Sequence, residues 1–432
     1  MKIRQRSAAV SVLLVAALLA SACSDDDANP LSDTSLGVVT VKQGDPIRIL
    51  KMSLIQDVGP EALDYAHIVD LAIEDYGPIH GSFTFEAGEM IEDLCDAEHG
   101  PQMAEAVLAD RSAVGLIGPS CSATSAVISQ PVTAAGLAMI SFSNTSPLLT
   151  SNLSGTPSEH HQPGYYRTAH NDLHQGEAVS AFLHDRLGPQ DVAVVHEGDA
   201  YTLGLAQAFR DAFERHGGTI TNFIEIDSGT TDLDEVLGQL AAEDPDALFF
   251  PLGQETAAGF VQGVRQHGAF GDTVLVSADA VLYNTFLGLP STAGAYIAGP
   301  DLDFANRANQ ATGMNAEQVA ERFTDKTGAP PVRAFWAHAY DATTLLLDAV
   351  AAASRVEGGD LVIYRAGIRQ YLDYVANYQG IIGEISCDGF GDCGTGKISI
   401  IEHRDPENPE ASRQSVVYRF SPQSPASTEA HE

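Results

Sequence analysis

Positive charge is scarce in this chain. Its 432 residues include 23 lysines and arginines against 58 aspartates and glutamates, a formal net charge of −35. The lysines are scattered, at Lys2, Lys42, Lys51, Lys326 and Lys397. A nucleic-acid interface needs clustered cations to neutralise phosphates, so this composition excludes nucleic acid as a partner. The acidity itself fits solubility or a salty habitat and predicts no ligand.

Long apolar runs are missing too, except near the N-terminus. Residues 1–22 have a basic start, an apolar run over 8–20 and small residues before Cys23, the plan of a secretory signal peptide. That run is too short for an ordinary membrane span. Residues 19–23 (LASAC) resemble a bacterial lipobox, whose cysteine is lipidated, although leucine stands one place early. We expect an exported periplasmic or cell-surface protein, anchored to a bacterial membrane by lipid on Cys23; a plain secretory signal is the alternative.

Cysteines are few, and their number fits export. With Cys23 lipidated, four remain. An even number in an exported chain favours two disulfides, and closeness in sequence favours Cys387–Cys393 and therefore Cys95–Cys121, among three possible pairings. A catalytic thiol at Cys121 is the alternative, and it needs a free thiolate beside a base.

Both ends of the mature chain lack periodicity. Residues 23–45 are acidic and then polar, and we expect a tether that holds the folded body away from the membrane. Residues 421–432 are expected to be a disordered tail.

The first half of the body alternates strands and helices. Expected strands cover 47–55, 83–91, 113–117 and 138–141, with helices over 61–76 and 103–109 and another between the last two strands. The runs 113–117 and 138–141 are each followed by a turn rich in small hydroxyl residues. Such loops meet at the carboxyl edge of neighbouring parallel strands, where open α/β sheets bind ligands.

A second unit of similar build follows a polar crossover at 151–164. Expected strands are 191–196, 219–226, 247–250 and 274–276, with helices 203–216, 233–242 and 256–267. A strand over 295–298 returns the chain to the first unit. Helices 316–327, 339–354 and 361–377 should pack there, and a hairpin of 382–385 with 397–402 and a strand over 415–420 should end the body.

This organisation predicts an α/β fold with two doubly wound, Rossmann-like lobes. Lobe 1 should hold residues 46–164 and 299–378, and lobe 2 residues 165–298 and 379–420. Three connections between the lobes make a hinge, and a closing cleft between them suits a small ligand.

From about residue 47 to 420 the chain resembles the type I periplasmic binding proteins, in their branched-chain amino acid (leucine/isoleucine/valine-binding) group. The resemblance rests on Cys95-Asp before an amphipathic helix, GLIGPSCS at 115–122, MISFSNTSP at 139–147, HEGDAY at 196–201 with Gly204, and AYDA at 339–342. It implies a Venus-flytrap protein that delivers an amino acid to the permease and ATPase of an ABC importer. In the family the first cysteine pair is a disulfide beside the ligand loop.

The resemblance also implies ligand-binding residues. Ser122, at a helix start, and Thr145 should donate to an α-carboxylate, with backbone contacts around Asn144. Asp279 matches the family's acidic position for the ammonium group, and Tyr201 should close over the ligand. The plainer alternatives are a helix cap for Ser122 and an exposed turn for Asp279.

The pocket wall that contacts the ligand side chain is less defined. The family has an aromatic residue after the strand 247–250, whereas this chain reads Pro-Leu-Gly-Gln at 251–254. Phe142 and Phe335 are candidates for the wall, although aromatics at such places also build cores.

Other functions find weaker support. Gly118-Pro-Ser-Cys-Ser122 lacks the final glycine of a hydrolase nucleophile turn, so we predict no enzyme. A zinc site at His160, His161, His170 and His174 lacks Cys or Glu at ligand spacing, and Asp388 with Asp392 is too short for an EF-hand, so we expect neither metal nor cofactor. A sensor of the same fold, or a binder of an amide or another small carboxylate, stays open.

Overall fold

The structure is a computed structural model that describes residues 31–55, 63–188, 190–230 and 232–422. The expected signal peptide, Cys23 with its lipid and the tail from residue 423 onward lie outside the described residues, as do the expected loop at 56–60 and the first residues of the helix after it. No helix in the described part of the chain is long and apolar enough to cross a membrane.

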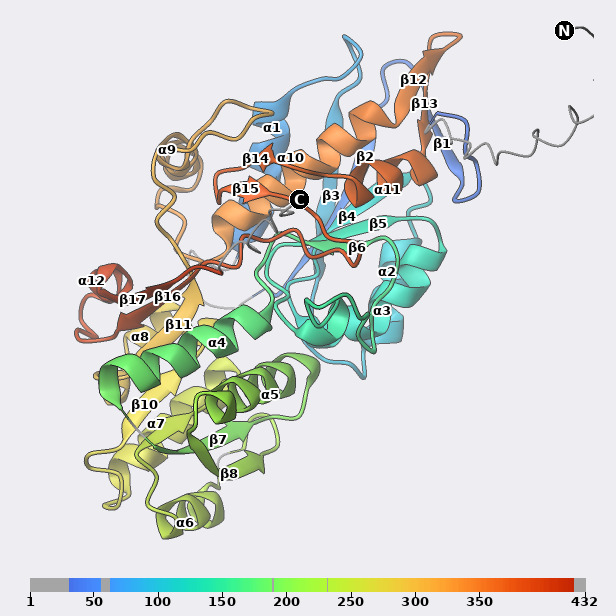
Figure 1. The fold of residues 1–432 in the computed structure, drawn as a ribbon. Coiled ribbons are helices and arrows are strands. Elements are labelled where there is room, and N and C mark those ends of the chain that lie inside the picture. The colour runs from blue at the N-terminus through green and yellow to red at the C-terminus, as the bar shows by residue number, and fades with distance from the viewer. Residues whose placement is uncertain (1–30, 56–62, 189, 231, 423–432) are drawn as a thin grey trace, which may run out of the picture.

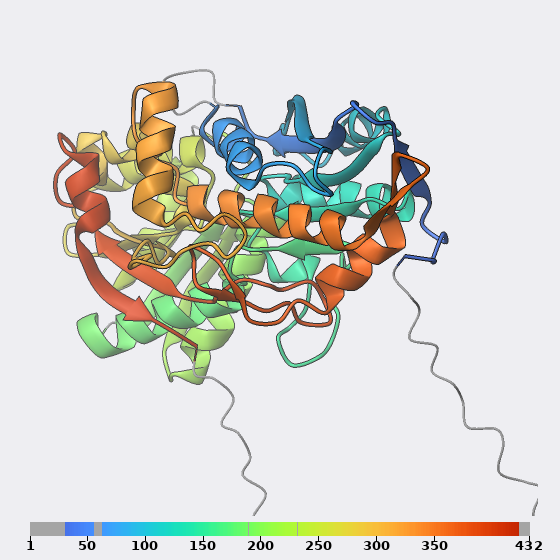
Figure 2. The same ribbon diagram turned by 90° about the horizontal axis from the view of Figure 1, so that it is seen from above.

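Lobe 1 is built on a five-stranded parallel sheet in the order β3-β2-β4-β5-β6 (Figure 1). Every residue of its central strand β4 is buried, as expected for a strand covered on both faces. Helices α1 and α10 pack on one face, where Figure 2 shows them side by side, and α2 and α3 pack on the other. The strands are β2 (Ile47–Ser53), β3 (Phe85–Glu92), β4 (Ala113–Ile117), β5 (Ala138–Ser141) and β6 (Tyr165–Arg167), and the helices are α1 (Asp64–Tyr76), α2 (Gly100–Leu108), α3 (Ser122–Ala134) and α10 (Trp336–Ala352).

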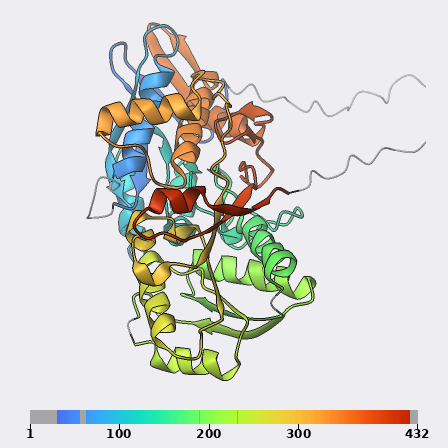
Figure 3. The ribbon, with the colours of Figure 1, turned by 90° about the vertical axis from the view of Figure 1, so that its left-hand side faces the viewer.

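Lobe 2 is built on a seven-stranded mixed sheet in the order β17-β16-β11-β10-β9-β7-β8, and Figure 3 shows the two lobes one above the other. Helices α4 and α5 cover one face of this sheet, and α6 and α7 the other. The strands are β7 (Asp191–His196), β8 (Thr219–Glu225), β9 (Ala247–Phe249), β10 (Val274–Ser277), β11 (Tyr296–Pro300), β16 (Ile398–Glu402) and β17 (Val416–Phe420). The helices are α4 (Asp172–Phe182), α5 (Ala200–Arg215), α6 (Asp234–Ala242), α7 (Gln254–Gln266), α8 (Asn284–Leu287) and α12 (Pro409–Gln414).

The described chain passes between the lobes three times. It crosses after β6 into α4, after β11 toward α9 (Ala316–Thr327), and between β15 (Glu384–Ile385) and β16. Helix α9 has a capping box of Asn315 and Gln318, and the left-handed Gly328 that follows Thr327 caps its C-terminus. The predicted α/β class, with two doubly wound lobes and a hinge, is confirmed.

Two segments next to lobe 1 differ from the prediction. The end of the expected tether contains strand β1 (Val38–Val41), which pairs with β13 (Asp360–Tyr364). The helix expected over 361–377 is instead β13 followed by α11 (Arg365–Asp373). β13 also pairs with β12 (Ser354–Glu357) through the two-residue turn Gly358-Gly359, whose positive φ angles glycine permits. A short apolar run such as β13 fits either a strand or a helix, and its distant partner β1 decided the outcome.

The expected boundaries and final hairpin also differ. β6 pairs with β5, so residues 165–167 belong to lobe 1 rather than opening lobe 2. β15 pairs with β14 (Tyr378–Gln379), not with residues 397–402, and β16 pairs with β11 and β17. The buried carboxylate of Asp341 on α10 accepts the Ile381 and Ile382 N–H groups at 2.9 Å each, which holds the β14–β15 turn on lobe 1. No local pattern in the sequence predicts these hydrogen bonds to Asp341.

Candidate functional site

The loop after β4 approaches the rest of lobe 1 closely before helix α3 begins. Gly118 has a positive φ, and a Cβ there would collide with the Met52 carbonyl, so this position needs glycine. Helix α3 then begins at Ser122, where the sequence predicted a helix start. The buried Ser122 hydroxyl accepts the Ser146 N–H at 3.4 Å, which leaves its own proton for another acceptor.

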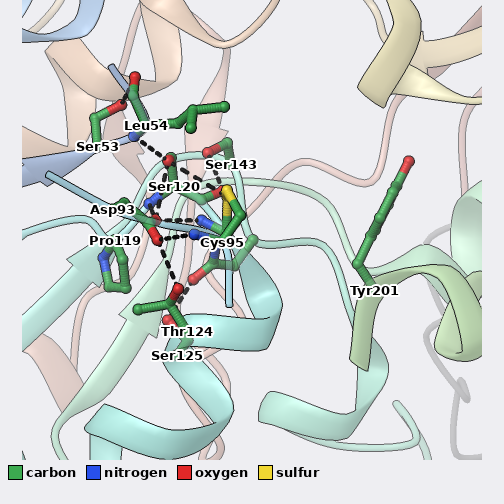
Figure 4. Close-up of a disulfide and its surroundings, with 12 residues drawn as sticks. Ser53, Leu54, Asp93, Cys95, Pro119, Ser120, Thr124, Ser125, Ser143 and Tyr201 are labelled. Carbon is green, nitrogen blue, oxygen red and sulfur yellow. Dashed lines mark hydrogen bonds between the residues drawn. A yellow bond between two sulfur atoms is a disulfide. The ribbon is translucent and has the colours of Figure 1, made fainter. Parts of the chain in front are cut away.

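A carboxylate of the protein itself anchors this loop. Asp93 is fully buried and accepts the N–H groups of Ser120 and Cys121, each at 2.8 Å, and the Thr124 hydroxyl at 2.5 Å (Figure 4). A negative charge is favourable beside the start of α3 because the helix dipole is positive there. Sequence reasoning missed Asp93, whose only signal was its place two residues before Cys95. The Ser120, Cys121 and Thr124 donors are therefore occupied by Asp93, whereas the Ser122 hydroxyl is not.

Both predicted disulfides are present. Cys95 pairs with Cys121 beside this loop, with the two Cα atoms 5.2 Å apart. Cys387 pairs with Cys393, with Cα atoms 3.9 Å apart, and closes the loop that contains Asp392.

A buried arginine that sequence reasoning missed holds the second candidate loop, which follows β5. Arg167, at the end of β6, is fully buried, and its Nη1 donates to the carbonyls of Asn144 at 3.2 Å and Ser146 at 2.7 Å. Its Nη2 donates to the Thr150 hydroxyl at 2.7 Å, and its Nε to Asp392 at 2.5 Å. The loop closed by the second disulfide thus supports the loop after β5 through the Arg167 guanidinium.

The loop after β5 offers fewer free groups than predicted. The Asn144 side-chain oxygen accepts the hydroxyl protons of Ser125 at 2.5 Å and Tyr165 at 3.1 Å, so this side chain serves the interior of lobe 1. The Thr145 hydroxyl is buried next to the Asp172 carboxyl, whose pKa it lowers, and it makes no hydrogen bond of good geometry among the described residues. Phe142 packs against Tyr65, with ring centroids 4.4 Å apart. Of these three candidates, Thr145 is the one with an unused polar atom suited to a ligand.

Lobe 2 brings Tyr201 and Asp279 together. Tyr201, in the first turn of α5, donates its hydroxyl proton to Asp279 Oδ1 at 3.2 Å, and Figure 4 shows its side chain across from the disulfide loop. Gln175 on α4, which the sequence did not single out, donates to the same oxygen at 3.0 Å. Burial raises the pKa of Asp279 to about 6, and these two hydrogen bonds oppose the rise.

Asp172 lies beside Asp279, and sequence reasoning missed it too. Burial and the neighbouring charge of Asp279 raise the Asp172 pKa well above its usual range, while Thr145 and Arg167 partly offset the rise. His170 completes the group; burial lowers its pKa to about 3, so it is neutral at physiological pH.

The two lobes touch at these loops. The Ser146 hydroxyl donates to the Ala200 carbonyl at 2.5 Å, and the Asp172 N–H donates to the Thr145 carbonyl at 2.9 Å. A Cβ on Gly204 of α5 would lie 2.9 Å from the Ser146 oxygen, so glycine permits this approach. The loops after β5 and β7 therefore meet, as the prediction of a site shared between lobes requires.

Phe335 lies at the start of α10, against one of the four histidines considered for zinc. Phe335 precedes α10 and stacks on His170, with ring centroids 5.9 Å apart, and His170 in turn lies beside Asp172 and Asp279. Among the described residues, no group of possible metal ligands contains more than one of the four histidines considered for zinc. His161 packs on Phe390 and His174 on Phe420, while His170 lies with Asp172 and Asp279.

A cavity of about 390 Å³ lies elsewhere, at the hinge. It is lined by the segment after β11, the approach to α10, and α12 with its neighbours, and it includes Arg333 and Trp336. Among the described residues, none of the predicted ligand-binding residues lines this cavity. The candidate site is defined by its buried polar groups instead.

Comparison with known proteins points to one family. A family model described as periplasmic binding protein matches residues 91–392. A leucine-specific-binding protein of Salmonella typhimurium is 27% identical over 166 residues, 38% of this chain and 42% of that protein. The chain therefore spans less than half the length of this curated relative.

Solved structures share the fold at low sequence identity. A branched-chain amino acid transporter substrate-binding protein of Streptococcus pneumoniae, solved with isoleucine, has a TM-score of 0.67 at 18% identity, covering 88% of this chain and 100% of that one. A solute-binding protein of R. palustris, solved with 4-hydroxybenzoate, has a TM-score of 0.65 at 17% identity, covering 83% and 93%.

Proposed function

The chain belongs to the periplasmic binding protein family, whose members bind solutes for ABC transporters rather than catalyse reactions, and from this premise we propose that it captures a small amino acid between its lobes. The ligand would be branched-chain or of similar size, and an ABC importer would receive it. The names of the leucine-specific relative and of the isoleucine-bound neighbour support this class.

One observation carries the proposal: unused donors and unused acceptors lie on opposite sides of the contact between the lobes. Lobe 1 presents the Ser122 hydroxyl at the start of α3 and the Thr145 hydroxyl, which makes no hydrogen bond of good geometry in the described part of the chain. Lobe 2 presents Asp279, supported by Tyr201. A zwitterion has a carboxylate for the first set and an ammonium group for the second, so bound ligand would hold the lobes together.

The fold alone does not select this ligand, because a neighbour of the same fold holds 4-hydroxybenzoate, an acid without an ammonium group. The buried acid on the lobe 2 side favours an amino acid instead. Phe335, which stacks on His170 beside that acid, is the better-placed wall for an apolar side chain, whereas Phe142 packs against Tyr65.

A thermal-shift screen of amino acids, amides and small carboxylates tests the proposal. We expect aliphatic amino acids to raise the melting temperature, since a ligand that binds only the folded state stabilises it. No shift with any amino acid, together with a shift by an acid that lacks the ammonium group, would contradict it.

Replacing Ser122 with alanine should weaken binding of leucine about tenfold or more, because a hydrogen bond to a charged group contributes roughly 1.5–3 kcal/mol. Titration calorimetry measures the change. Ser129→Ala is the matched control, since Ser129 lies further along α3 with a buried hydroxyl that has no partner among the described residues. Equal affinities of wild type and Ser122→Ala would remove Ser122 from the site.

We also propose that lipid on Cys23 anchors the protein, which rests on the LASAC motif alone. Expressed in bacteria, the wild type should incorporate labelled palmitate and sediment with membranes, and Cys23→Ala should do neither. A wild-type protein that remains unlabelled would indicate an ordinary secretory signal.

A further inference from the structure

A buried arginine outside the candidate site lies where the two lobes meet. Arg333 shortly precedes α10, and only 1% of it is exposed. Its guanidinium carbon lies over two aromatic rings, 5.2 Å from the centroid of Tyr65 and 5.0 Å from that of Tyr283. A cation within about 6 Å of a ring centroid is attracted to the face of the ring. The attraction is strongest where water is excluded, as it is around this buried side chain.

The two rings belong to different lobes. Tyr65 lies in the first turn of α1, in lobe 1, and the neighbouring Asp64 carboxylate accepts the Val332 N–H at 3.1 Å, so the segment with Arg333 is held to the same lobe. Tyr283 lies in lobe 2, between β10 and α8, and its hydroxyl accepts from Arg333 Nη1 at 3.5 Å. The three side chains form an interlobe stack. A rotation that separates the lobes carries Tyr283 away and leaves the other two members together.

Each ring of the interlobe stack is connected to one half of the candidate site. Tyr65 packs against Phe142, with ring centroids 4.4 Å apart, and Phe142 opens the loop that contains Thr145. Tyr283 comes two residues after the 3₁₀ turn Asp279–Val281, which begins with the candidate acid of lobe 2. The stack therefore spans the same division between the lobes as the donors and the acid of the site.

Other arginine–ring contacts among the described residues do not cross between the lobes. Arg210 lies 5.1 Å from the Phe223 ring centroid within lobe 2, and Arg355 lies 5.2 Å from that of Tyr364 in the sheet beside lobe 1. The side chains of these two arginines are 35% and 45% exposed, so water weakens both contacts. The buried contacts of Arg333 are the ones placed to hold the lobes together.

We propose that Arg333 is a positioning residue whose stack with Tyr65 and Tyr283 stabilises the closed arrangement of the lobes and thereby raises the affinity for ligand. The proposal rests on the proposed function for its ligand readout, whereas closure of the lobes can be measured without ligand. A ligand that binds the closed arrangement better gains from anything that makes this arrangement more populated. Because the stack breaks when the lobes separate, its loss should act mainly on the rate of ligand release.

The test compares two substitutions of the half-buried Tyr283 in the full chain. Tyr283→Leu removes the ring from lobe 2, whereas Tyr283→Phe keeps the ring and removes only the hydroxyl. In small-angle X-ray scattering without ligand, Tyr283→Leu should have a larger radius of gyration than wild type, and Tyr283→Phe should match wild type. Arg210→Met, which removes an arginine–ring contact within lobe 2, should also match wild type.

Leucine release gives the second readout. Trp336, the single tryptophan of the chain, lines the hinge cavity with Arg333, so its fluorescence in stopped-flow mixing follows closure. Leucine should leave Tyr283→Leu about tenfold faster than wild type, and Tyr283→Phe at a rate within about twofold of wild type. Arg333→Met should reproduce the result of Tyr283→Leu. If Arg333→Met does not fold, the pair of Tyr283 variants decides.

Three results would overturn the inference. An unchanged release rate in Tyr283→Leu, with only a lower melting temperature, assigns the stack to fold stability alone. Equal losses in Tyr283→Phe and Tyr283→Leu assign the effect to the hydroxyl rather than to the ring. A wild type that binds no amino acid contradicts the proposed function but leaves the scattering test in force, and equal radii of gyration for wild type and Tyr283→Leu then overturn the stack as well.

Discussion

Asp279→Asn should reduce leucine binding by about 3 kcal/mol or more, roughly a hundredfold, because removing one partner of a buried charge pair leaves the other uncompensated. Asparagine keeps the shape of the side chain, and its oxygen can still accept from Gln175 and Tyr201. Asp172 lies close enough to accept from the new amide N–H groups. Calorimetry with leucine measures the loss, and Asp211→Asn, the same substitution on the exposed surface of α5, is the control.

The same substitution should stabilise the folded protein when no ligand is bound. The Asp279 pKa is about 6 when folded, above the unfolded value of 3.8, so the folded state favours the protonated form. The protonated Asp279 carboxyl contributes fully to the stability of the folded state below pH 3.8, and this contribution is lost as the pH rises through about 6. At pH 7.5 the free energy of unfolding of the asparagine variant should therefore exceed that of wild type by up to about 3 kcal/mol, and at pH 4.5 by much less. Urea unfolding at the two pH values measures the difference.

Two outcomes would contradict this account of Asp279. Undiminished leucine affinity in the variant would show that another group binds the ammonium. A ligand-free variant less stable than wild type at pH 7.5 would show that the Asp279 charge is already compensated. A variant that is more stable than wild type but no longer binds leucine shows the trade-off expected when a site keeps an uncompensated buried charge for its ligand.

Arg167→Met should destabilise the folded protein by about 3–5 kcal/mol, the usual cost of removing one partner of a buried ion pair. Methionine keeps much of the length of the side chain but leaves Asp392, whose side chain is 10% exposed, without its cation. The carbonyls of Asn144 and Ser146 lose a donor as well, so leucine binding should weaken through the loosened loop. Urea unfolding measures the stability.

A double-mutant cycle isolates the ion pair in that loss. Asp392→Asn alone should cost less than Arg167→Met, because an amide is cheaper to bury than an unpaired carboxylate. The double variant should be more stable than the sum of the single losses predicts, by roughly 0.5–3 kcal/mol. Strict additivity would show that Arg167 acts through the carbonyls and Thr150, not through Asp392.

Local pattern predicted much of the architecture and the two loops that lobe 1 contributes to the candidate site. The apolar runs at 113–117 and 138–141 form β4 and β5, and their hydroxyl-rich loops lie where parallel strands end. Ser122 begins α3 as predicted, and the cysteines pair as their closeness in sequence suggested. Each of these features follows from residues near one another in the chain, where periodicity and spacing carry information.

The groups that support the site depend on contacts that no local pattern reports. Arg167 meets Asp392 across 225 positions, Gln175 meets Asp279 across 104, and strand β1 finds its partner β13 beyond α10. Asp93 is an ordinary aspartate in the sequence and becomes the anchor of the loop between β4 and α3 only because β3 ends beside α3.

The sequence by itself therefore determined the two-lobed α/β plan, the disulfide pairs and the loops that bear the candidate ligand residues, because short-range spacing encodes all three. The tertiary structure alone decided which acids become buried together and which donors remain unused. Burial and charge compensation depend on the whole fold, and they made Asp172 and Asp279 a pair.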